Sequence, residues 1–354
     1  MNGLRTGYTT GACAAAAAKA AASLLIDGRR AAAVSITLRE GETASFPLVS
    51  VEEGDGWARA SVKKSAGDDP DVTDGVTVVA TVQKSLSPGV AFEAGEGVGR
   101  VTKAGLSVPP GEPAINPGPR RMIEAAVREV TSEGLTVRIS IPGGEELAKR
   151  TFNPRLGVVG GLSILGTTGR VHPYSSSALK SALTCALDVA AAAGVNGPVL
   201  VPGHIGEEAA RRHFTLGQDQ VIQVSNEWGY MLDQARERDF SALLVLGHPG
   251  KLTKLAGGQW DTHSSRSGSA VPLVAKRAEK LLGADLSGHA TVEGQLAALP
   301  GDQRKQLAGA IASRVRSAVE ERTQKRFGVA VLLINLKGDI LGESGDVTPW
   351  PRRD

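Results

Sequence analysis

Four aspartates crowd one short loop in the first quarter of the chain. Asp68, Asp69, Asp71 and Asp74 lie within seven positions, and Pro70 stiffens the loop between them. Carboxylates this close raise one another's pKa unless a cation or a hydrogen-bond donor stabilises their negative charges. The loop could supply a general base, a metal site or a carboxylate that faces a sulfonium, although it lacks EF-hand spacing. We expect Asp68 or Asp69 to be catalytic, and Asp71 and Asp74 to shape the loop through Asx-type turns. The alternative is that all four aspartates only shape the loop.

Basic residues concentrate in a second loop, at 95–121, which is dense in glycine and proline. Arg100, Lys103, Arg120 and Arg121 make it the most basic region of the N-terminal half. Guanidinium groups bind carboxylates in a bidentate manner, so the loop is suited to an acidic small molecule. A solvated rim is the alternative. A helix is expected to follow over 120–130, with proline near its start.

Three glycine-rich turns, at 166–169, 203–206 and 247–250, each follow an apolar run and precede a helical pattern. A strand, a tight glycine turn and a helix present backbone N–H groups to an anionic ligand at the C-terminal edge of an α/β sheet. Glu227 lies just past an expected strand, roughly twenty residues after the second turn, where dinucleotide folds place the acid that holds a ribose diol. The glycine spacing departs from GxGxxG, and plain strand-to-helix turns are the alternative.

An alanine-rich stretch near the N-terminus predicts a tightly packed helix. Residues 12–22 are apolar except for Lys19, and Thr9 or Thr10 can cap the helix that alanine carries to about residue 26. The small side chains imply a very close neighbour. The threonine hydroxyls and free N–H groups at the helix start could also contact a ligand; a capped packing helix is the alternative.

The remaining elements divide the chain at residue 153. Period-two patterns at 33–39, 43–49, 58–64, 76–83 and 136–141 predict an antiparallel sheet. After a buried strand expected at 156–165 and a helix from 175–177 to 194, strands at 198–202, 221–225 and 241–247 alternate with helices. Further helices begin near 270, 291 and 302, and a hairpin joins 328–335 to 340–341. We therefore expect an α+β domain at 1–152 with an antiparallel sheet, and an α/β domain at 153–354 with a mainly parallel, Rossmann-like sheet.

Composition narrows the functional class. The chain has 354 residues, of which 41% are hydrophobic and 22% charged, as in ordinary soluble proteins. The net charge of +3 is too small to argue for nucleic acid. Cys13 and Cys185 suit small core positions in a reducing cytoplasm, and no Cys and His cluster has metal-ligand spacing. We expect a cytoplasmic protein with no metal site, signal peptide or membrane span.

Six islands of sequence together resemble the CbiD family, the cobalt-precorrin-5B C1-methyltransferases of anaerobic cobalamin biosynthesis. They occur in the family's order across nearly the whole chain: GYTTGACAAAAAKAA (7–21), AGDDPDVTDG (66–75), GVGRVTKAGL (97–106), GEPAINPGPRRMI (111–123), LGVVGGLSILGTTG (156–169) and GHPGKLTKLAGG (247–258) followed by THS (262–264). Six motifs in order make coincidence improbable.

The resemblance implies transfer of a methyl group from S-adenosylmethionine (SAM) to C1 of cobalt-precorrin-5B, which yields cobalt-precorrin-6A. The cobalt arrives with the tetrapyrrole, and the reaction needs aligned reactants, a dry pocket and one proton acceptor. It also allows transient contacts with neighbouring pathway enzymes. A carrier or scaffold for the corrinoid intermediate, without chemistry, is the alternative.

The candidate residues then fall into three sets. The catalytic candidates are Asp68 and Asp69. The SAM-binding candidates, which leave open which turn binds, are Gly166, Thr167, Thr168, Gly169, Gly203, Gly206, Glu227, Gly247 and Gly250. The substrate-binding candidates are Thr9, Thr10, Lys103, Arg120, Arg121, Lys251 and His263.

Overall fold

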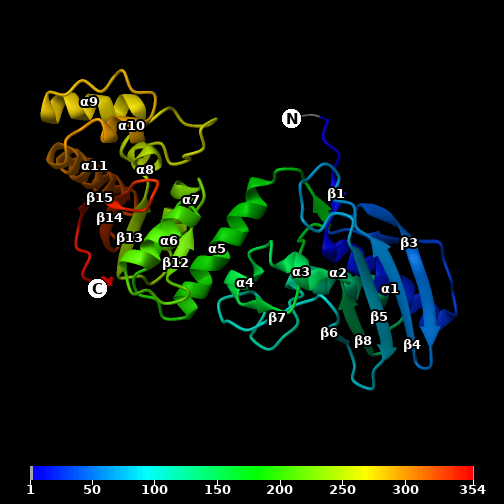
Figure 1. Ribbon diagram of the computed structural model, residues 1–354. Coiled ribbons are helices and arrows are strands. Elements are labelled where there is room, and N and C mark those ends of the chain that lie inside the picture. Colours follow the sequence, from blue (N-terminus) through cyan, green and yellow to red (C-terminus); the bar gives the residue numbers. More distant parts are fainter. Residues whose placement is uncertain (1–2, 354) are drawn as a thin grey trace. The chain divides into compact units, whose positions relative to one another are not determined.

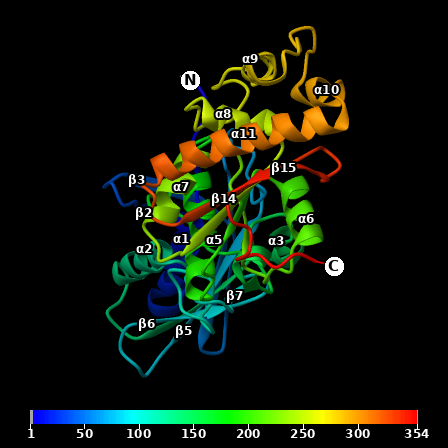
Figure 2. The ribbon, with the colours of Figure 1, turned by 90° about the vertical axis from the view of Figure 1, so that its left-hand side faces the viewer.

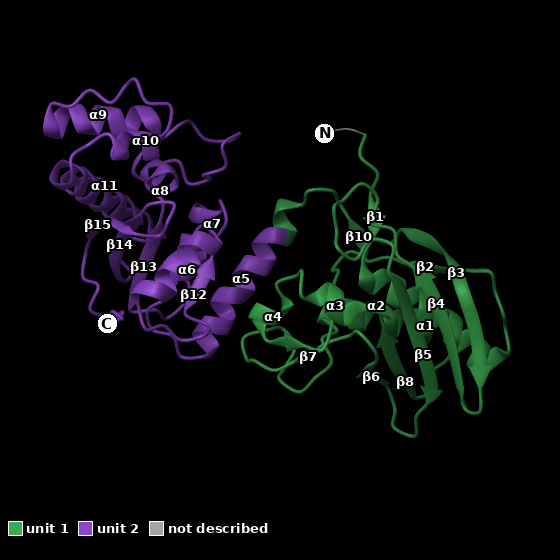
Figure 3. Cartoon of the chain, viewed as in Figure 1, with its two compact units in different colours: residues 1–178 green, residues 179–354 purple. Residues whose placement is uncertain are grey.

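The computed structural model describes residues 3–353 and divides the chain into two compact units, residues 1–178 and 179–354 (Figure 3). Residues 1, 2 and 354, at the ends of the expected domains, lie outside the described residues. The division falls after residue 178 and differs from the boundary expected at residue 153. The reason is that the segment at 158–171 forms two-stranded pairings with earlier parts of the first unit.

The first unit contains a mixed six-stranded sheet (Figure 1). Its strands, in spatial order, are β2 (Ala33–Thr37), β3 (Thr43–Gly54), β4 (Trp57–Lys63), β5 (Thr77–Lys84), β8 (Leu135–Ser140) and β6 (Val90–Ala94). Neighbours from β2 to β8 run antiparallel, so the five strands predicted from period-two patterns are confirmed. The short strand β6 was not predicted, and its parallel pairing with β8 makes the sheet mixed rather than purely antiparallel.

The alanine-rich stretch forms α1 (Thr10–Asp27), as predicted. Thr9 is its N-cap and accepts a hydrogen bond from the Ala12 N–H, whereas Gly28 ends the helix in the left-handed conformation, with φ of 64°. The helix contacts strands β2 to β5 and α2 (Pro117–Arg128). Every alanine from 14 to 18 is 0% exposed, so the small side chains let the helix approach the sheet closely.

The buried strand predicted at 156–165 is wrong. The chain instead forms α4 (Asn153–Leu156) and the two-residue strand β9 (Val158–Val159), which pairs with β7 (Arg100–Val101). Gly157 and Gly160 have φ of 76° and 84°, a conformation that glycine adopts without strain and that interrupts an extended strand. The segment ends at β10 (Arg170–Val171), which pairs with β1 (Gly7–Tyr8). The short helix α3 (Gly144–Ala148) precedes it in the chain.

The second unit is built on a five-stranded sheet. Its strands, in spatial order, are β12 (Val221–Gln223), β11 (Val199–Val201), β13 (Ala242–Gly247), β14 (Gly328–Ile334) and β15 (Ile340–Ser344). The first four are parallel, and β15 is an antiparallel edge strand. Four of the five strands are thus parallel, as expected of a mainly parallel sheet. The sheet follows the doubly wound arrangement in which the strand order reverses between the first and third strands, here β11 and β13.

Helices cover both faces of this sheet. They are α5 (Ser176–Ala192), α6 (His204–His213), α7 (Trp228–Arg236), α8 (Pro249–Ala256), α9 (Val271–Leu282), α10 (Val292–Ala297) and α11 (Gly301–Arg322). Leu243 and Val245 of β13 join a core with α7, α8 and α11, whereas Leu244 and Leu246 face α6 and Trp350. Figure 2 shows α11 running across β14 and β15. No described helix is both long and apolar enough to span a membrane.

Replacing Ala16 of α1 with leucine is expected to lower the free energy of unfolding by about 1–3 kcal/mol, because the added atoms overpack a fully buried position. The matched control is Ala125→Leu at an exposed position of α2, which should change it by no more than about 0.5 kcal/mol. Denaturant melts measure both. Equal stability of the two variants would contradict the close packing of α1.

Candidate functional site

The strand order of the second unit brings two of the three predicted glycine turns together. Because β11 pairs directly with β13, the turns that follow these strands are neighbours, and a Cβ on Gly247 would lie 2.9 Å from Pro202 Cδ. A Cβ on Gly206 would lie 2.9 Å from Val201 Cβ, so this glycine lets α6 approach β11. A Cβ on Gly203 would meet nothing within 4 Å, so its backbone borders open space. Doubly wound sheets bind ligands at such a reversal, outside the carboxyl ends of the strands.

The end of β12 joins the same edge through Asn226. Its side-chain Oδ1 accepts hydrogen bonds from Lys251 Nζ at 3.0 Å and from Thr262 Oγ1 at 3.2 Å, and its backbone oxygen accepts one from the Thr262 N–H at 3.1 Å. Ser225, one residue earlier, has φ of 56°, which is uncommon for a residue other than glycine. The end of β12, the first turn of α8 and the polar loop at 261–266 therefore meet at one place, and backbone strain of this kind tends to gather at functional sites.

Glu227 lies beside this junction and is only 9% exposed. Its carboxylate lies 3.5 Å from Lys180 Nζ and 4.0 Å from Arg266 Nη1, and Arg266 also pairs with Asp261 at 2.9 Å. We call the charged and polar residues of this region the edge cluster: Lys180, Asn226, Glu227, Lys251, Lys254, Asp261, Thr262 and Arg266. The cluster combines an acid suited to a hydroxyl-rich group with an excess of cations suited to an anion.

The two lysines of α8 are shielded from water to different degrees. Lys251 is half-buried, and burial followed by the neighbouring charge of Lys254 lowers its pKa. Lys254 is 7% exposed and donates to Ser267 Oγ at 2.8 Å and to the Thr262 carbonyl at 3.3 Å. Within residues 3–353, no ion pair joins a carboxylate to either ammonium group.

Two histidines lie near this edge in different roles. His248 caps α8: its Nδ1 accepts a hydrogen bond from the Gly250 N–H at 3.0 Å, and its Nε2 lies 2.7 Å from Glu293 Oε2. The first bond places the proton on Nε2, which donates to Glu293 and ties α10 to α8. A Cβ on Gly250 would lie 2.9 Å from His248 Nδ1, so the cap requires glycine. His263 is exposed, and its Nδ1 lies 2.7 Å from Ser265 Oγ.

The acid loop of the first unit is largely neutralised by cations from outside it. Arg5 binds Asp68 through its backbone N–H at 2.7 Å and its guanidinium at 2.9 Å, and these bonds lower the pKa of that carboxyl. Asp71 accepts hydrogen bonds from the buried Lys64 at 2.9 Å and from the Thr73 N–H at 2.7 Å. Burial opposes the effect, but the Lys64 and Thr73 bonds hold the pKa of Asp71 below its usual value.

Asp69, Asp71 and Asp74 each accept a hydrogen bond from a backbone N–H. Asp71 makes the predicted Asx turn to Thr73, whereas Asp74 binds the N–H of Ala66, eight residues away, at 2.7 Å. The Asx turn expected at Asp74 is therefore wrong, and Asp74 closes the loop instead. Asp69 accepts from the Tyr174 N–H at 2.8 Å through Oδ1. Since Asp68 is held by Arg5, Asp69 is the better placed of the two catalytic candidates to accept a proton.

The basic loop is less open than the sequence suggested. Arg120 donates to the carbonyls of Ile115 and Pro113, pairs with Glu112 at 3.1 Å and lies over the Phe92 ring. Lys103 Nζ reaches the carbonyl of Arg155 at 3.5 Å. Arg121 is exposed and makes no hydrogen bond or ion pair with any described residue. Of the three predicted carboxylate-binding residues, Arg120 is engaged in holding the loop, and Arg121 is available to a ligand.

The third glycine turn lies in the first unit, and its predicted place at the parallel sheet is wrong. It wraps the start of α1: the Gly11 N–H donates to the Leu165 carbonyl at 2.9 Å, and the Thr9 N–H donates to the Gly169 carbonyl at 3.0 Å. The Leu165 N–H donates to Thr10 Oγ1 at 2.9 Å. A Cβ on Gly166 would lie 2.3 Å from Thr9 Oγ1. Thr9 and Thr10 are therefore buried packing residues, which argues against the ligand contact expected of them.

Thr167 and Thr168 lie within the same turn. Thr168 Oγ1 accepts a hydrogen bond from the Arg170 N–H at 3.2 Å, and Thr167 is exposed. Thr168 and Arg170 also line a small pocket of about 260 Å³ with Glu42 and His172, where Arg170 pairs with Glu42. The turn is thus part of the first unit's surface and core.

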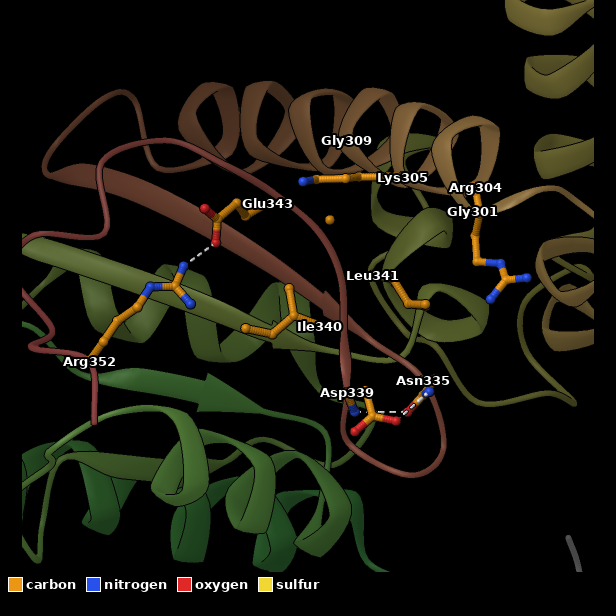
Figure 4. A pocket seen from close by; sticks show the side chains of 11 residues that line it. Gly301, Arg304, Lys305, Gly309, Asn335, Asp339, Ile340, Leu341, Glu343 and Arg352 are labelled. Atoms are coloured by element: carbon orange, nitrogen blue, oxygen red, sulfur yellow. Dashed lines mark hydrogen bonds and ion pairs between the residues drawn. The ribbon is translucent and has the colours of Figure 1, made fainter. Parts of the chain in front are cut away.

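A larger pocket, of about 680 Å³, lies between α11 and the edge strand β15 (Figure 4). Its carboxylates already have partners: Glu343 pairs with Arg352, and Asp339 accepts from Asn335 Nδ2 at 3.0 Å and from Arg212 at 3.1 Å. Arg304 donates to three carbonyl oxygens at the end of α10 and beyond. Because the carboxylates, Arg304 and Arg352 of this pocket are bonded within the chain, and among its charged lining residues Lys305 alone lacks a side-chain bond to a described residue, the edge cluster is the stronger candidate site. Over the described part of the chain, no group of three or more His, Cys, Asp or Glu side chains could hold a metal ion.

The structure thus unites Gly203, Gly206, Glu227, Gly247, Gly250, Lys251 and His263 in one unit. Asn226 and Thr262 are not among the candidates selected from the sequence. Asn226 could have been found from its position just after β12, and Thr262 from its place in the THS motif. The burial of Lys254 is likewise not evident from the sequence, because only the packing of α8 reveals it.

Comparisons with known proteins agree with the six sequence motifs. The family model for CbiD matches residues 1–173, and that for the CbiD C-terminal domain matches residues 261–345. The chain is 55% identical over 350 residues to the cobalt-precorrin-5B C(1)-methyltransferase of Syntrophotalea carbinolica, covering 99% of this chain and 100% of that one. It is 42% identical over 347 residues to the protein of the same name from Moorella thermoacetica, covering 96% and 94%.

A solved structure is also similar. The crystal structure of the cobalamin biosynthesis protein CbiD from Archaeoglobus fulgidus shares 32% sequence identity, covers 74% of this chain and 83% of that chain, and has a TM-score of 0.39.

Proposed function

The chain belongs to the CbiD family, and from that premise we propose that it transfers a methyl group from SAM to C1 of cobalt-precorrin-5B, giving cobalt-precorrin-6A. The observation that carries the proposal is the full-length similarity to relatives named for this reaction. The protein is an enzyme of cobalamin biosynthesis, and the cobalt belongs to its substrate. The carrier without chemistry, considered from the sequence, gains no support from any observation in the structure.

The carboxyl edge of the second unit's sheet is proposed to bind SAM. When bound, SAM supplies an electrophilic methyl group on a sulfonium. Gly203 borders open space at the strand-order reversal, and Gly247 lies next to it, so backbone there can approach a ligand closely. Glu227 is buried and follows β12, the strand that pairs with β11, and its carboxylate is suited to accept hydrogen bonds from a ribose diol. Gly206 and Gly250 support this edge indirectly by allowing the close packing of α6 and the cap of α8.

The first unit is proposed to supply residues for the tetrapyrrole. Arg121 binds a peripheral carboxylate of the substrate, because its guanidinium is exposed and uncommitted to any described residue. Arg120 holds the preceding loop in shape, and Lys103 lies on the neighbouring carbonyl of Arg155. Lys251 and His263 of the second unit are further proposed contacts to anionic groups.

Asp69 is proposed to accept the proton that the macrocycle sheds from another of its atoms after C1 has been methylated. Its Oδ1 is fixed by the Tyr174 N–H, and no described residue pairs a cation with it. Asp68 is a weaker base because the bonds from Arg5 keep its pKa low. A carboxylate near the reacting carbon would also stabilise the positive charge that develops there.

The purified protein is expected to convert cobalt-precorrin-5B and SAM into one methylated tetrapyrrole per S-adenosylhomocysteine formed, measured by mass spectrometry. Glu227→Gln should weaken S-adenosylhomocysteine binding about tenfold in calorimetry, since a charged acceptor is lost. Glu237→Gln, an exposed change at the end of the same helix, is the matched control. Binding of the tetrapyrrole without any methylated product would indicate a carrier.

Arg121→Ala is expected to raise the KM for the tetrapyrrole about tenfold while kcat and the KM for SAM stay close to wild type. The reason is that an exposed guanidinium would be lost from the carboxylate-binding surface only. Arg39→Ala removes the same charge from another exposed position and should change neither KM. Equal rises in both KM values for Arg121→Ala would place this residue outside the tetrapyrrole contact.

Asp69→Asn is expected to lower kcat by about a hundredfold or more with an unchanged melting temperature, because the amide keeps the Tyr174 hydrogen bond but accepts no proton. Asp68→Asn should keep most of kcat and melt earlier, since it loses the charge bound by Arg5. Stopped-flow rates and thermal melts measure both. Wild-type kcat in folded Asp69→Asn would rule out its role as the base.

A further inference from the structure

The edge cluster holds more positive charge than its carboxylates can match. Its cations are Lys180, Lys251, Lys254 and Arg266, and its carboxylates are Glu227 and Asp261. Both carboxylates are already taken, Glu227 by Lys180 and Arg266, and Asp261 by Arg266. The surplus therefore resides on the two lysines of α8.

The surroundings of these lysines offer neutral oxygen acceptors in place of an ionic partner. Lys251 donates to an amide oxygen of Asn226, and Lys254 donates to a hydroxyl and a carbonyl. Glu293, which reaches the same end of α8 from α10, is bonded to His248. Buried charges in proteins are normally paired with an opposite charge or a ligand, because burial without one is costly. Two such cations one helical turn apart thus point to an anion that binds beside them.

The Lys251 ammonium is fixed in position and keeps hydrogen-bond donors for such an anion. An ammonium has three N–H donors, and the structure shows one of them engaged, with Asn226 Oδ1 at 3.0 Å. That oxygen is fixed in turn by Thr262 Oγ1 at 3.2 Å, so the amine is positioned before any ligand arrives. Lys254 is more deeply buried and adds a second positive charge, which attracts the anion without contacting it.

We propose that Lys251 and Lys254 form a carboxylate subsite at the carboxyl edge of the sheet, with Lys251 as the direct ion-pair partner and Lys254 as a buried supporting charge. The proposal rests on the proposed binding of SAM at this edge and specifies which group lies there. Two sources carry the required chemistry, the carboxylate of the methionyl part of SAM and a peripheral carboxylate of the tetrapyrrole.

The test compares ligands that differ in that carboxylate. Isothermal calorimetry measures binding of S-adenosylhomocysteine, of 5′-methylthioadenosine, which lacks the amino-acid carboxylate, and of cobalt-precorrin-5B to the wild type and to Lys251→Met. If the carboxylate is that of SAM, Lys251→Met weakens S-adenosylhomocysteine binding about tenfold or more and leaves 5′-methylthioadenosine unchanged. If it is that of the tetrapyrrole, only cobalt-precorrin-5B binding falls by that factor. Either result supports the subsite and identifies its source.

Controls separate this inference from the proposed function. Lys276→Met removes an exposed lysine of α9 and should change no affinity. Lys251 is chosen over Lys254 because it is half-buried, and Asn226 keeps its bond to Thr262 in the variant; a thermal melt checks folding. Wild-type affinity of folded Lys251→Met for all three ligands overturns the subsite, even if Glu227→Gln still weakens S-adenosylhomocysteine. Failure of the wild type to bind either nucleoside overturns the placement of SAM itself.

Discussion

Hydrogen bonding between the parallel strands β11, β12 and β13 brings the turns that follow these strands to one edge of the second unit's sheet. Because β11 is paired in register with both neighbours, the turn after β11 lies about one strand spacing from the turns after β12 and β13. Residues as distant in sequence as Asn226 and Thr262 then meet, and Lys251 joins them from the first turn of α8. The candidate site is thus a consequence of strand order, since no single loop contains it.

The glycines of the first unit serve another purpose. The turn at 166–169 and the start of α1 interlock so closely that a Cβ on Gly11 would lie 2.8 Å from Pro119 Cγ, and one on Gly166 would overlap Thr9. Small residues here allow helices and turns to approach backbone to backbone, as the alanines of α1 do against the sheet. The same type of motif, glycine and threonine in a short turn, therefore supports packing in one unit and borders open space in the other. A motif's residue types do not distinguish these outcomes; its neighbours in three dimensions do.

This distinction explains what could be predicted from the sequence. Period-two patterns gave β2 to β5 and β8, and strand–helix alternation gave the parallel strands of the second unit, because local burial patterns determine both. The apolar run at 156–165 misled for the opposite reason: Gly157 and Gly160 interrupt it with positive φ, and its residues pack against separate neighbours. The placement of Glu227 and Lys251 at the carboxyl edge of the sheet could be predicted from their positions after strands, whereas their roles in binding are proposals. The sequence could not exclude Arg120 as a substrate-binding residue, because the carbonyls of Ile115 and Pro113 become its neighbours only when the loop folds back on itself.

Charge pairing separates a structural cluster from a candidate binding cluster in this molecule. The acid loop was the densest run of like charge in the sequence, yet Arg5 and Lys64 bind Asp68 and Asp71, so folding itself resolves much of the repulsion. Lys251 was a substrate-binding candidate from the sequence, but the burial of the two α8 lysines could not be seen there. Folding buries Lys254, half-buries Lys251 and brings no carboxylate to either among residues 3–353. A cluster whose charges are balanced by the chain needs no further partner. A cluster that the fold leaves cationic and partly dehydrated is stabilised when an anion binds, which is the property expected of a site and not of a scaffold.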